Sequence, residues 1–195
     1  GETMDEAVLR ECATVRRAAG MFDASTLGKI EVVGPDAAAF LDFIYTGKPS
    51  SLATGRCRYA LMLREDGFIL DDGIITRVEA DRFHVTTTSA GAASVLATME
   101  DFRQTELPEM RVWLTSTTEQ WSVIAVTGPK ARDVLISVTD DGSLTNEDFP
   151  HRSMRTGPVE TVPARLVRVG CTGELRLWLN VGGGGATLDW ERVRR

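Results

Sequence analysis

The amino-acid sequence predicts an α+β fold in two lobes. Segments with strand-like apolar alternation come in groups, without the regular strand and helix rhythm of a parallel sheet, which predicts mixed or antiparallel sheets. A strand, a Gly-Pro turn and a helix also occur twice, first from Val32 and again from Val126. Copies about 94 residues apart indicate two related units. The alternative is coincidence, because Gly-Pro is favoured at the start of any helix. We expect one lobe at residues 1–55 plus 140–195 and the other at 56–139.

The composition of the chain argues against nucleic-acid-binding and membrane-spanning proteins. The chain has 195 residues, of which 43% are hydrophobic and 26% charged, so it is long enough for a substantial core. Its net charge of −6 argues against a nucleic-acid partner bound by bulk electrostatics. No apolar run has the length of about 18–20 residues that a membrane span needs, and the acidic first residues are unlike a signal peptide. We therefore expect a cytoplasmic protein without a membrane partner.

The chain contains only three cysteines and two histidines, which are few ligands for a metal site and few partners for disulfides. Cys12, Cys57 and Cys171 are far apart and lack paired ligand spacing, so neither a disulfide framework nor a zinc site is expected. His84 lies between two apolar residues of a predicted strand, where a structural histidine is the expected interpretation.

Three amphipathic helices are expected, at residues 4–19, 36–45 and 89–104. Thr3 and Glu6 fit a capping box at the start of the first helix, and Gly20 ends it. Apolar residues at helical spacing define the buried faces. In the three helices in turn, these residues are Met4, Val8, Cys12 and Val15; Ala39, Phe40, Phe43 and Ile44; and Ala92, Val95, Leu96, Met99 and Phe102.

Strands are expected where β-branched and apolar residues alternate. They fall at residues 29–33, 59–63, 68–70, 83–88, 112–114, 121–126, 162–169 and 175–181. Residues 20–25 are expected to be a connection, residues 140–146 a linker, and the glycine run at 182–185 flexible.

The stretch from residue 56 to residue 75 carries the main candidate chemistry. Two apolar segments flank an acidic turn at residues 65–67, which predicts a hairpin, and Asp71-Asp72 follows on the return strand. Burying a carboxylate is costly unless it is paired, so one of these residues is a candidate for a cavity wall. The alternative is a strand end at which both side chains are hydrated. Tyr59, Thr88 and Glu174 are further candidates, and no phosphate loop, metal motif or nucleophile elbow is present.

The order of several short motifs resembles the glycine-cleavage T-protein (aminomethyltransferase) family over nearly the whole chain. The motifs are GMFDAS at 20–25, GPDA at 34–37, RY at 58–59, GFILDD at 67–72, VTGPKA at 126–131 and CTGE at 171–174. Within that family, DASTLGK at 23–29 and TSTTEQW at 115–121 are most similar to the folate-binding region of sarcosine oxidase alpha subunits.

The resemblance implies a two-lobed, folate-binding α+β fold and transfer of a one-carbon unit to tetrahydrofolate, forming 5,10-methylenetetrahydrofolate. It places Asp71 at the family's key acidic position, where a carboxylate stabilises iminium character and moves protons. It implies that Tyr59, Thr88 and Glu174 contribute to the cofactor site. Flavin oxidation would occur in another part of such a complex, since this chain lacks the dinucleotide fingerprint.

Several positions depart from the family pattern, including Arg176 and Leu177, which stand where a glycine and an aromatic residue are usual. Cys171 stands where an aromatic residue is usual, and Trp178 stands where a glutamate holds the pterin's amino edge. The chain also stops short of the family's C-terminal β-barrel, as a truncated relative would. These departures support an alternative function, a catalytically silent scaffold or subunit-assembly domain that no longer binds folate. Expected partners are folate and either other sarcosine oxidase-type subunits or further copies of the chain.

Overall fold

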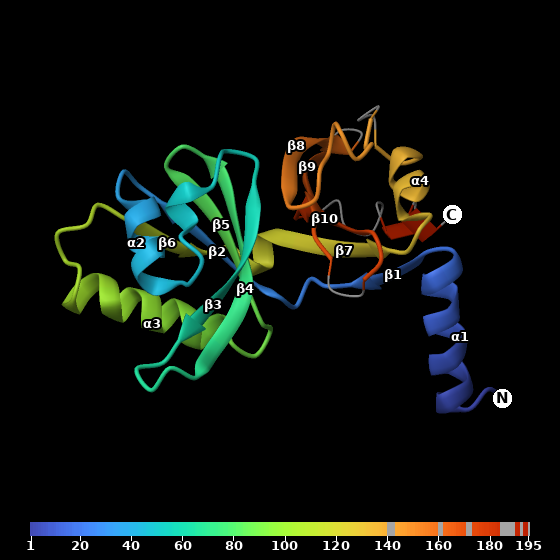
Figure 1. Cartoon of the computed structure of the whole chain (residues 1–195), viewed down its shortest axis with the longest axis horizontal. Coiled ribbons are helices and arrows are strands. Elements are labelled where there is room, and N and C mark those ends of the chain that lie inside the picture. The colour runs from blue at the N-terminus through green and yellow to red at the C-terminus, as the bar shows by residue number, and fades with distance from the viewer. Residues whose placement is uncertain (140–142, 160–161, 171–172, 184–189, 192, 195) are drawn as a thin grey trace. The chain divides into compact units, whose positions relative to one another are not determined.

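A computed structural model covers residues 1–195, and the structure describes all of them except 140–142, 160–161, 171–172, 184–189, 192 and 195. Internal contacts divide the chain into two units. Unit 1 contains Gly1–Ser25 and Trp121–Arg195, and unit 2 contains Thr26–Gln120. Each unit is built on a five-stranded antiparallel sheet (Figure 1). The α+β class and the antiparallel sheets predicted from the sequence are confirmed.

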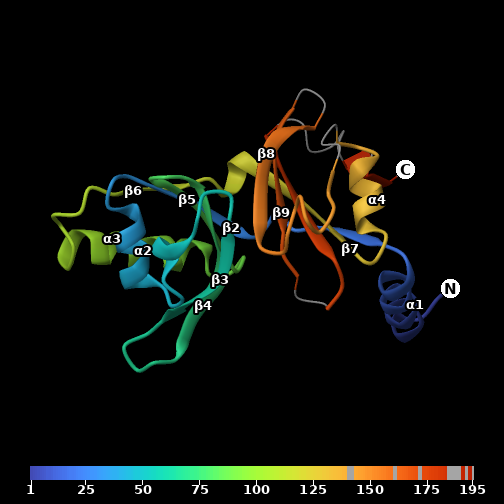
Figure 2. The same ribbon diagram turned by 45° about the horizontal axis from the view of Figure 1, so that its top comes forward.

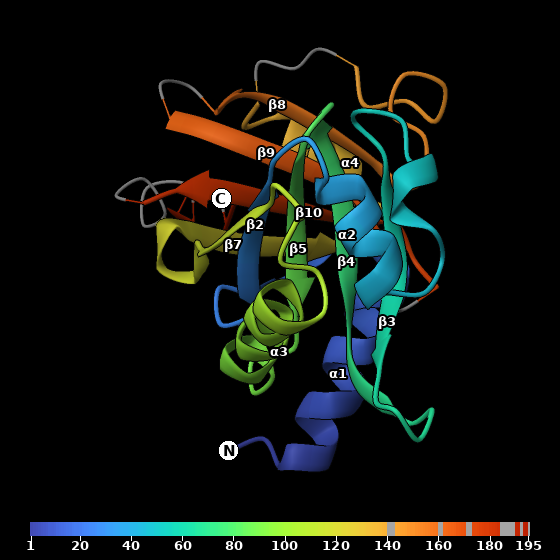
Figure 3. The same cartoon turned by 90° about the vertical axis from the view of Figure 1, so that its left-hand side faces the viewer.

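Unit 2 contains a sheet with the strand order β3-β4-β5-β2-β6 and two helices that lie on the same side of it (Figure 3). Its apolar core lies between that face and the helices. In chain order the elements are β2 (Gly28–Val33), α2 (Ala37–Ile44), the 3-10 helix η1 (Pro49–Ser51), β3 (Cys57–Leu63), β4 (Ile69–Glu79), β5 (Arg82–Thr87), α3 (Ala92–Thr105), β6 (Trp113–Ser116) and the 3-10 helix η2 (Thr118–Gln120).

Unit 1 contains a sheet with the order β1-β7-β10-β9-β8, and strands β7 to β9 and helix α4 are visible in Figure 2. A second apolar core is built on this sheet. Its elements are α1 (Met4–Arg17), β1 (Gly20–Asp23), β7 (Trp121–Thr127), α4 (Ala131–Ile136), β8 (Ser153–Val159), β9 (Val162–Arg168) and β10 (Arg176–Gly182).

The Gly-Pro repeat has the same backbone geometry in both units. Gly34 and Gly128 have φ angles of +136° and +121°, which side chains rarely tolerate. A Cβ atom at Gly34 would lie 2.1 Å from the carbonyl oxygen of Arg111, and one at Gly128 would lie 2.4 Å from that of Ala18. In each case the carbonyl belongs to the segment that precedes the edge strand of the sheet. The strand orders also correspond, so the structure favours related units over a coincidence of local chemistry.

The unit boundaries differ from the expected lobes of 1–55 plus 140–195 and 56–139. Residues 26–55 belong to unit 2, because β2 pairs with β5 and β6. Residues 121–139 belong to unit 1, because β7 pairs with β1 and β10. The expected boundaries followed loops in the sequence, whereas long-range strand pairing determines the units.

The predicted helices form, but their buried faces were only partly anticipated. In α2 the core residues are Ala37, Phe40, Leu41 and Ile44, so the prediction was wrong for Ala39, which is exposed, and for Phe43, which is 55% exposed. The stripe of α3 is buried or half-buried as predicted. The capping box between Thr3 and Glu6 is present, yet α1 buries no residue. None of the helices in the described ranges is long and apolar enough to cross a bilayer.

Two strands were missed. Residues 20–23 form β1 rather than a connection, and residues 153–159 form β8. Both lie at sheet edges, where one partner strand suffices, and β8 contains a glycine and a proline that weaken a strand pattern in the sequence.

Candidate functional site

The predicted hairpin is formed by β3 and β4 in unit 2. Its register pairs Tyr59 with Ile74, Leu61 with Asp72 and Met62 with Asp71. Directly paired residues of an antiparallel ladder share a face, and neighbours along a strand alternate between faces. The adjacent residues Asp71 and Asp72 therefore project from opposite faces of the sheet.

Asp71 lies on the face that carries the unit 2 core and is only 5% exposed. Its Oδ1 accepts a hydrogen bond from Thr88 Oγ1 at 2.5 Å, and its Oδ2 accepts one from the Thr88 backbone N–H at 3.2 Å. Thr88 Oγ1 in turn accepts from the N–H of Gly91, the first residue before α3. A Cβ at Gly91 would lie 2.4 Å from Asp71 Oδ1. The carboxylate thus fixes the turn between β5 and α3.

Tyr45 is a neighbour of this carboxylate that sequence reasoning missed. It follows α2 and forms an isolated bridge with Met62, the register partner of Asp71. Its hydroxyl is buried and has no hydrogen-bond partner among the described residues. Burial, and to a lesser extent the negative charge of Asp71, raises the pKa of the Tyr45 phenol well above its usual range. No sequence pattern signals this contact, because only the bridge to β3 creates it.

The opposite face of the hairpin presents Tyr59 and Asp72. Tyr59 is 42% exposed and Asp72 is exposed. Ile74, which lies on β4 directly opposite Tyr59, is buried. Tyr59 and Asp72 are diagonal neighbours, a relation that typically separates Cα atoms by about 7–8 Å. The resemblance implies one site that contains both Tyr59 and Asp71, but this register places their side chains on opposite faces of the sheet. The carboxylate that shares a face with Tyr59 is Asp72.

Further along the same face, a buried ionic network crosses the sheet. Glu31 and His84 are paired in register, and His84 Nδ1 lies 3.0 Å from Glu31 Oε1. Arg82 Nε donates to Glu31 Oε2 at 2.7 Å. This hydrogen bond is the main cause of a raised Arg82 pKa. His84 is 3% exposed and held by this pair, as expected for a structural histidine.

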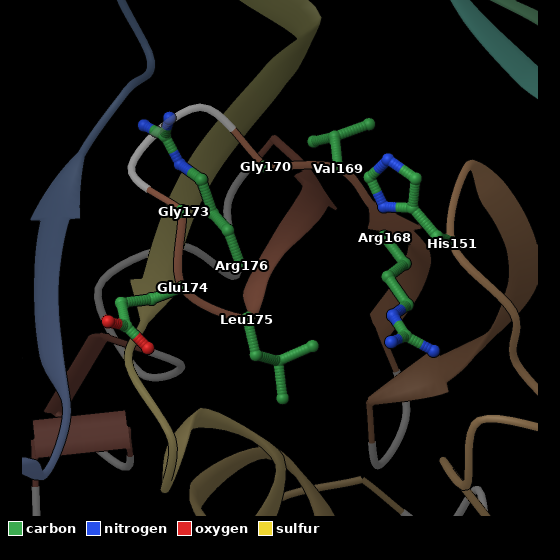
Figure 4. A pocket seen from close by; sticks show the side chains of 8 residues that line it. All are labelled: His151, Arg168, Val169, Gly170, Gly173, Glu174, Leu175 and Arg176. Atoms are coloured by element: carbon green, nitrogen blue, oxygen red, sulfur yellow. The ribbon is translucent and has the colours of Figure 1, made fainter. Parts of the chain in front are cut away.

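The remaining predicted positions belong to unit 1. Glu174 accepts a hydrogen bond from Arg16 Nη1 at 2.9 Å. It also lines a cavity of about 330 Å³ beside the β9 and β10 strands (Figure 4). Trp178 is 7% exposed, and its Nε1 has no partner within the described part of the chain. An indole N–H can only donate, whereas the glutamate that the resemblance implies for this position would accept. Cys171 lies outside the described residues.

The structure thus brings Asp71 and Thr88 together and puts Tyr59 on the other face of their sheet. Among the residues described, no group of histidine, cysteine and acidic side chains could hold a metal ion. What the hairpin can do chemically is present a flat aromatic surface beside an exposed carboxylate, which suits a planar ligand that carries or develops positive charge.

Comparisons with known proteins identify a family and several similar chains. A family model described as the GCVT N-terminal domain matches residues 1–194. The chain is 43% identical over 194 residues to sarcosine oxidase subunit alpha from Corynebacterium sp. (strain U-96), an alignment that covers 99% of this chain and 20% of that protein. It is 34% identical over 186 residues to an aminomethyltransferase from Corynebacterium aurimucosum, covering 95% of this chain and 49% of the relative.

A solved structure agrees with the sequence comparisons. The glycine cleavage system aminomethyltransferase T from Bartonella henselae superposes with a TM-score of 0.82 at 27% identity, covering 95% of this chain and 48% of that one. The chain therefore spans about half the length of the aminomethyltransferases and about a fifth of the sarcosine oxidase subunits that it matches.

Proposed function

The chain belongs to the family of GCVT N-terminal domains, and from this premise we propose that it binds tetrahydrofolate and transfers a one-carbon unit to it, forming 5,10-methylenetetrahydrofolate. The similarity to sarcosine oxidase alpha subunits over 99% of the chain supports a role as one domain of a longer protein of that kind. Other subunits of a sarcosine oxidase-type complex are then its proposed partners.

The observation that carries the proposal is the face of the hairpin shared by Tyr59 and Asp72. A reduced pterin is a flat heterocycle, and a partly exposed phenol ring offers it a stacking surface. An adjacent carboxylate favours the cationic character that develops during iminium transfer. Bound tetrahydrofolate would supply the amine nitrogens that accept the carbon. The protein's part is to orient the heterocycle and to place the Asp72 carboxylate beside it.

In this proposal the catalytic role expected of Asp71 is assigned to Asp72, because Asp72 shares a face with Tyr59. Asp71 uses both oxygens on Thr88 and lies on the core face, so in this proposal it positions the turn before α3. Thr88 supports the site through Asp71, and Glu174, bound by Arg16, shapes unit 1. Tyr59 retains its expected role as a cofactor contact.

A silent scaffold of the same fold remains the alternative, and Trp178 favours it. Its buried indole N–H offers a donor at a position where an acceptor usually holds the pterin edge. Losing a charged hydrogen bond costs about 1.5–3 kcal/mol, which is about a tenfold to hundredfold loss of affinity.

Calorimetric titration of the 195-residue chain with tetrahydrofolate separates the two functions. The proposal predicts a saturable heat, and its absence at high micromolar folate would leave the scaffold. Transfer is then followed as formation of 5,10-methylenetetrahydrofolate, with the iminium supplied by an added sarcosine-oxidising flavoenzyme. Asp72→Asn should bind folate and lose most of the transfer rate, whereas unchanged transfer removes Asp72 from the mechanism.

A further inference from the structure

The cavity in unit 1 has a lining unlike that of the folate-binding hairpin. It measures about 330 Å³, which is enough for a small molecule. The described part of its wall comes from the loop before β8, the end of β9, the connection between β9 and β10, and the start of β10. It includes His151, Arg168, Val169, Glu174, Leu175 and Arg176. Figure 4 shows His151 and Arg168 on one side and Glu174 and Arg176 on the other.

Basic side chains predominate in this lining. The lining contains two arginines and one histidine but a single carboxylate, Glu174, and that carboxylate is already paired with Arg16 at 2.9 Å. Arg16 is not among the lining residues, so the negative charge of Glu174 is neutralised by a cation that does not line the cavity. The positive charge is local, because the whole chain carries a net charge of −6. Bulk attraction of anions is therefore not expected, and any anion bound here would be held by the cavity itself.

Arg168 lines the cavity with a guanidinium group that is only partly hydrogen-bonded by the described residues. Its Nη1 donates to the carbonyl oxygen of Phe149 at 2.6 Å, while its Nε is buried without a hydrogen-bond partner among the described residues. Arg132 is also only partly hydrogen-bonded by the described residues. Its Nη2 donates to Asn146 Oδ1 at 2.8 Å, and its Nε is buried without a partner among them. Burial, and then the charge of Arg132, lowers the pKa of Arg168. The positive charges of Arg132 and Arg168 thus lie close enough to repel each other.

We propose that this cavity binds an oxyanion group, the carboxylate or phosphate of a small molecule, with Arg168 as the principal ligand and His151 as the second. A guanidinium presents parallel donors that match the oxygens of either group. An anion beside Arg168 offsets the repulsion from Arg132. Val169 and Leu175 contribute apolar wall, which suits an organic acid or phosphate ester better than a bare ion. The inference does not depend on folate binding.

The test uses the 195-residue chain labelled with 15N and titrated separately with inorganic phosphate and with acetate. Chemical shifts of the Arg Nε–H and His151 side-chain signals report binding. We expect saturable shifts with at least one probe, and the better probe identifies the group recognised. Absence of saturation with both up to high millimolar concentration overturns the proposal. Reduced folate is left out, so failure of the proposed function does not affect this result.

Substitutions locate the site. Arg168→Gln should weaken binding of the better probe at least tenfold, and His151→Ala should weaken it severalfold. Because Arg168 also holds Phe149, Arg168→Lys serves as a second variant that keeps the charge and is expected to bind more weakly than the unmodified chain. Arg64→Gln, at an exposed turn of unit 2, is the matched control and should leave binding unchanged. Full affinity in folded Arg168→Gln and Arg168→Lys would overturn the assignment.

Discussion

Replacing Asp71 by asparagine tests the assignment of two adjacent carboxylates to opposite faces of β4. The carboxylate accepts two hydrogen bonds from Thr88, through Oγ1 at 2.5 Å and through the backbone N–H at 3.2 Å. Asparagine keeps one acceptor oxygen but turns an amide NH₂ toward the other donor. A hydrogen bond to a charged group contributes about 1.5–3 kcal/mol, and the site is almost fully buried. We expect Asp71→Asn to lower the free energy of unfolding by about 2–3 kcal/mol.

The assay is urea unfolding followed by circular dichroism, combined with native-state hydrogen exchange at the first turn of α3. Exchange there should accelerate, because Asp71 holds the turn that leads into this helix. The matched control is Asp72→Asn, which alters an exposed side chain and should change stability by less than about 0.5 kcal/mol. Equal destabilisation by the two substitutions, or none by Asp71→Asn, would refute the register argument.

Three further substitutions test other contacts. Tyr45→Phe should leave the protein at least as stable at pH 7, because it removes a buried hydroxyl without a partner in the described chain. Since the folded-state pKa of Tyr45 is raised, the unmodified protein should lose stability as the pH rises above about 10, and Tyr45→Phe should lose less in alkaline urea titrations. Gly34→Ala should lower the free energy of unfolding by about 2–3 kcal/mol, whereas the control Gly157→Ala, which has open space at its Cβ, should not. Equal melting curves for the two variants would contradict the turn geometry. Glu31→Gln should destabilise unit 2 by about 1–3 kcal/mol by weakening the hydrogen bond to Arg82, and unaltered hydrogen exchange in β2 would disprove that role.

The local elements of this fold are largely readable from the sequence. The β3 and β4 hairpin forms where an acidic turn separates two apolar segments, and its turn places Gly67 at a φ of +82°. The Gly-Pro turns start both predicted helices. These features depend on residues close together in the chain, so local patterns suffice to predict them.

The pairing of distant segments could not be predicted from the sequence. Which aspartate faces Tyr59 depends on the exact register of β3 with β4, and a shift by one residue would exchange the two faces. The contact between Tyr45 and β3 likewise follows from tertiary structure. Unit membership of residues 26–55 depends on the pairing of β2 with β5 and β6, and this pairing leaves no local signal.

Calorimetry with tetrahydrofolate tests the proposed function most directly. The account predicts a saturable heat for the 195-residue chain and an affinity about tenfold lower for Tyr59→Leu, which loses the stacking surface. Asp71→Asn, once its stability has been allowed for, should retain the affinity of the unmodified protein. No heat from the unmodified chain, or equal affinity in Tyr59→Leu, would contradict folate recognition by this face of the hairpin.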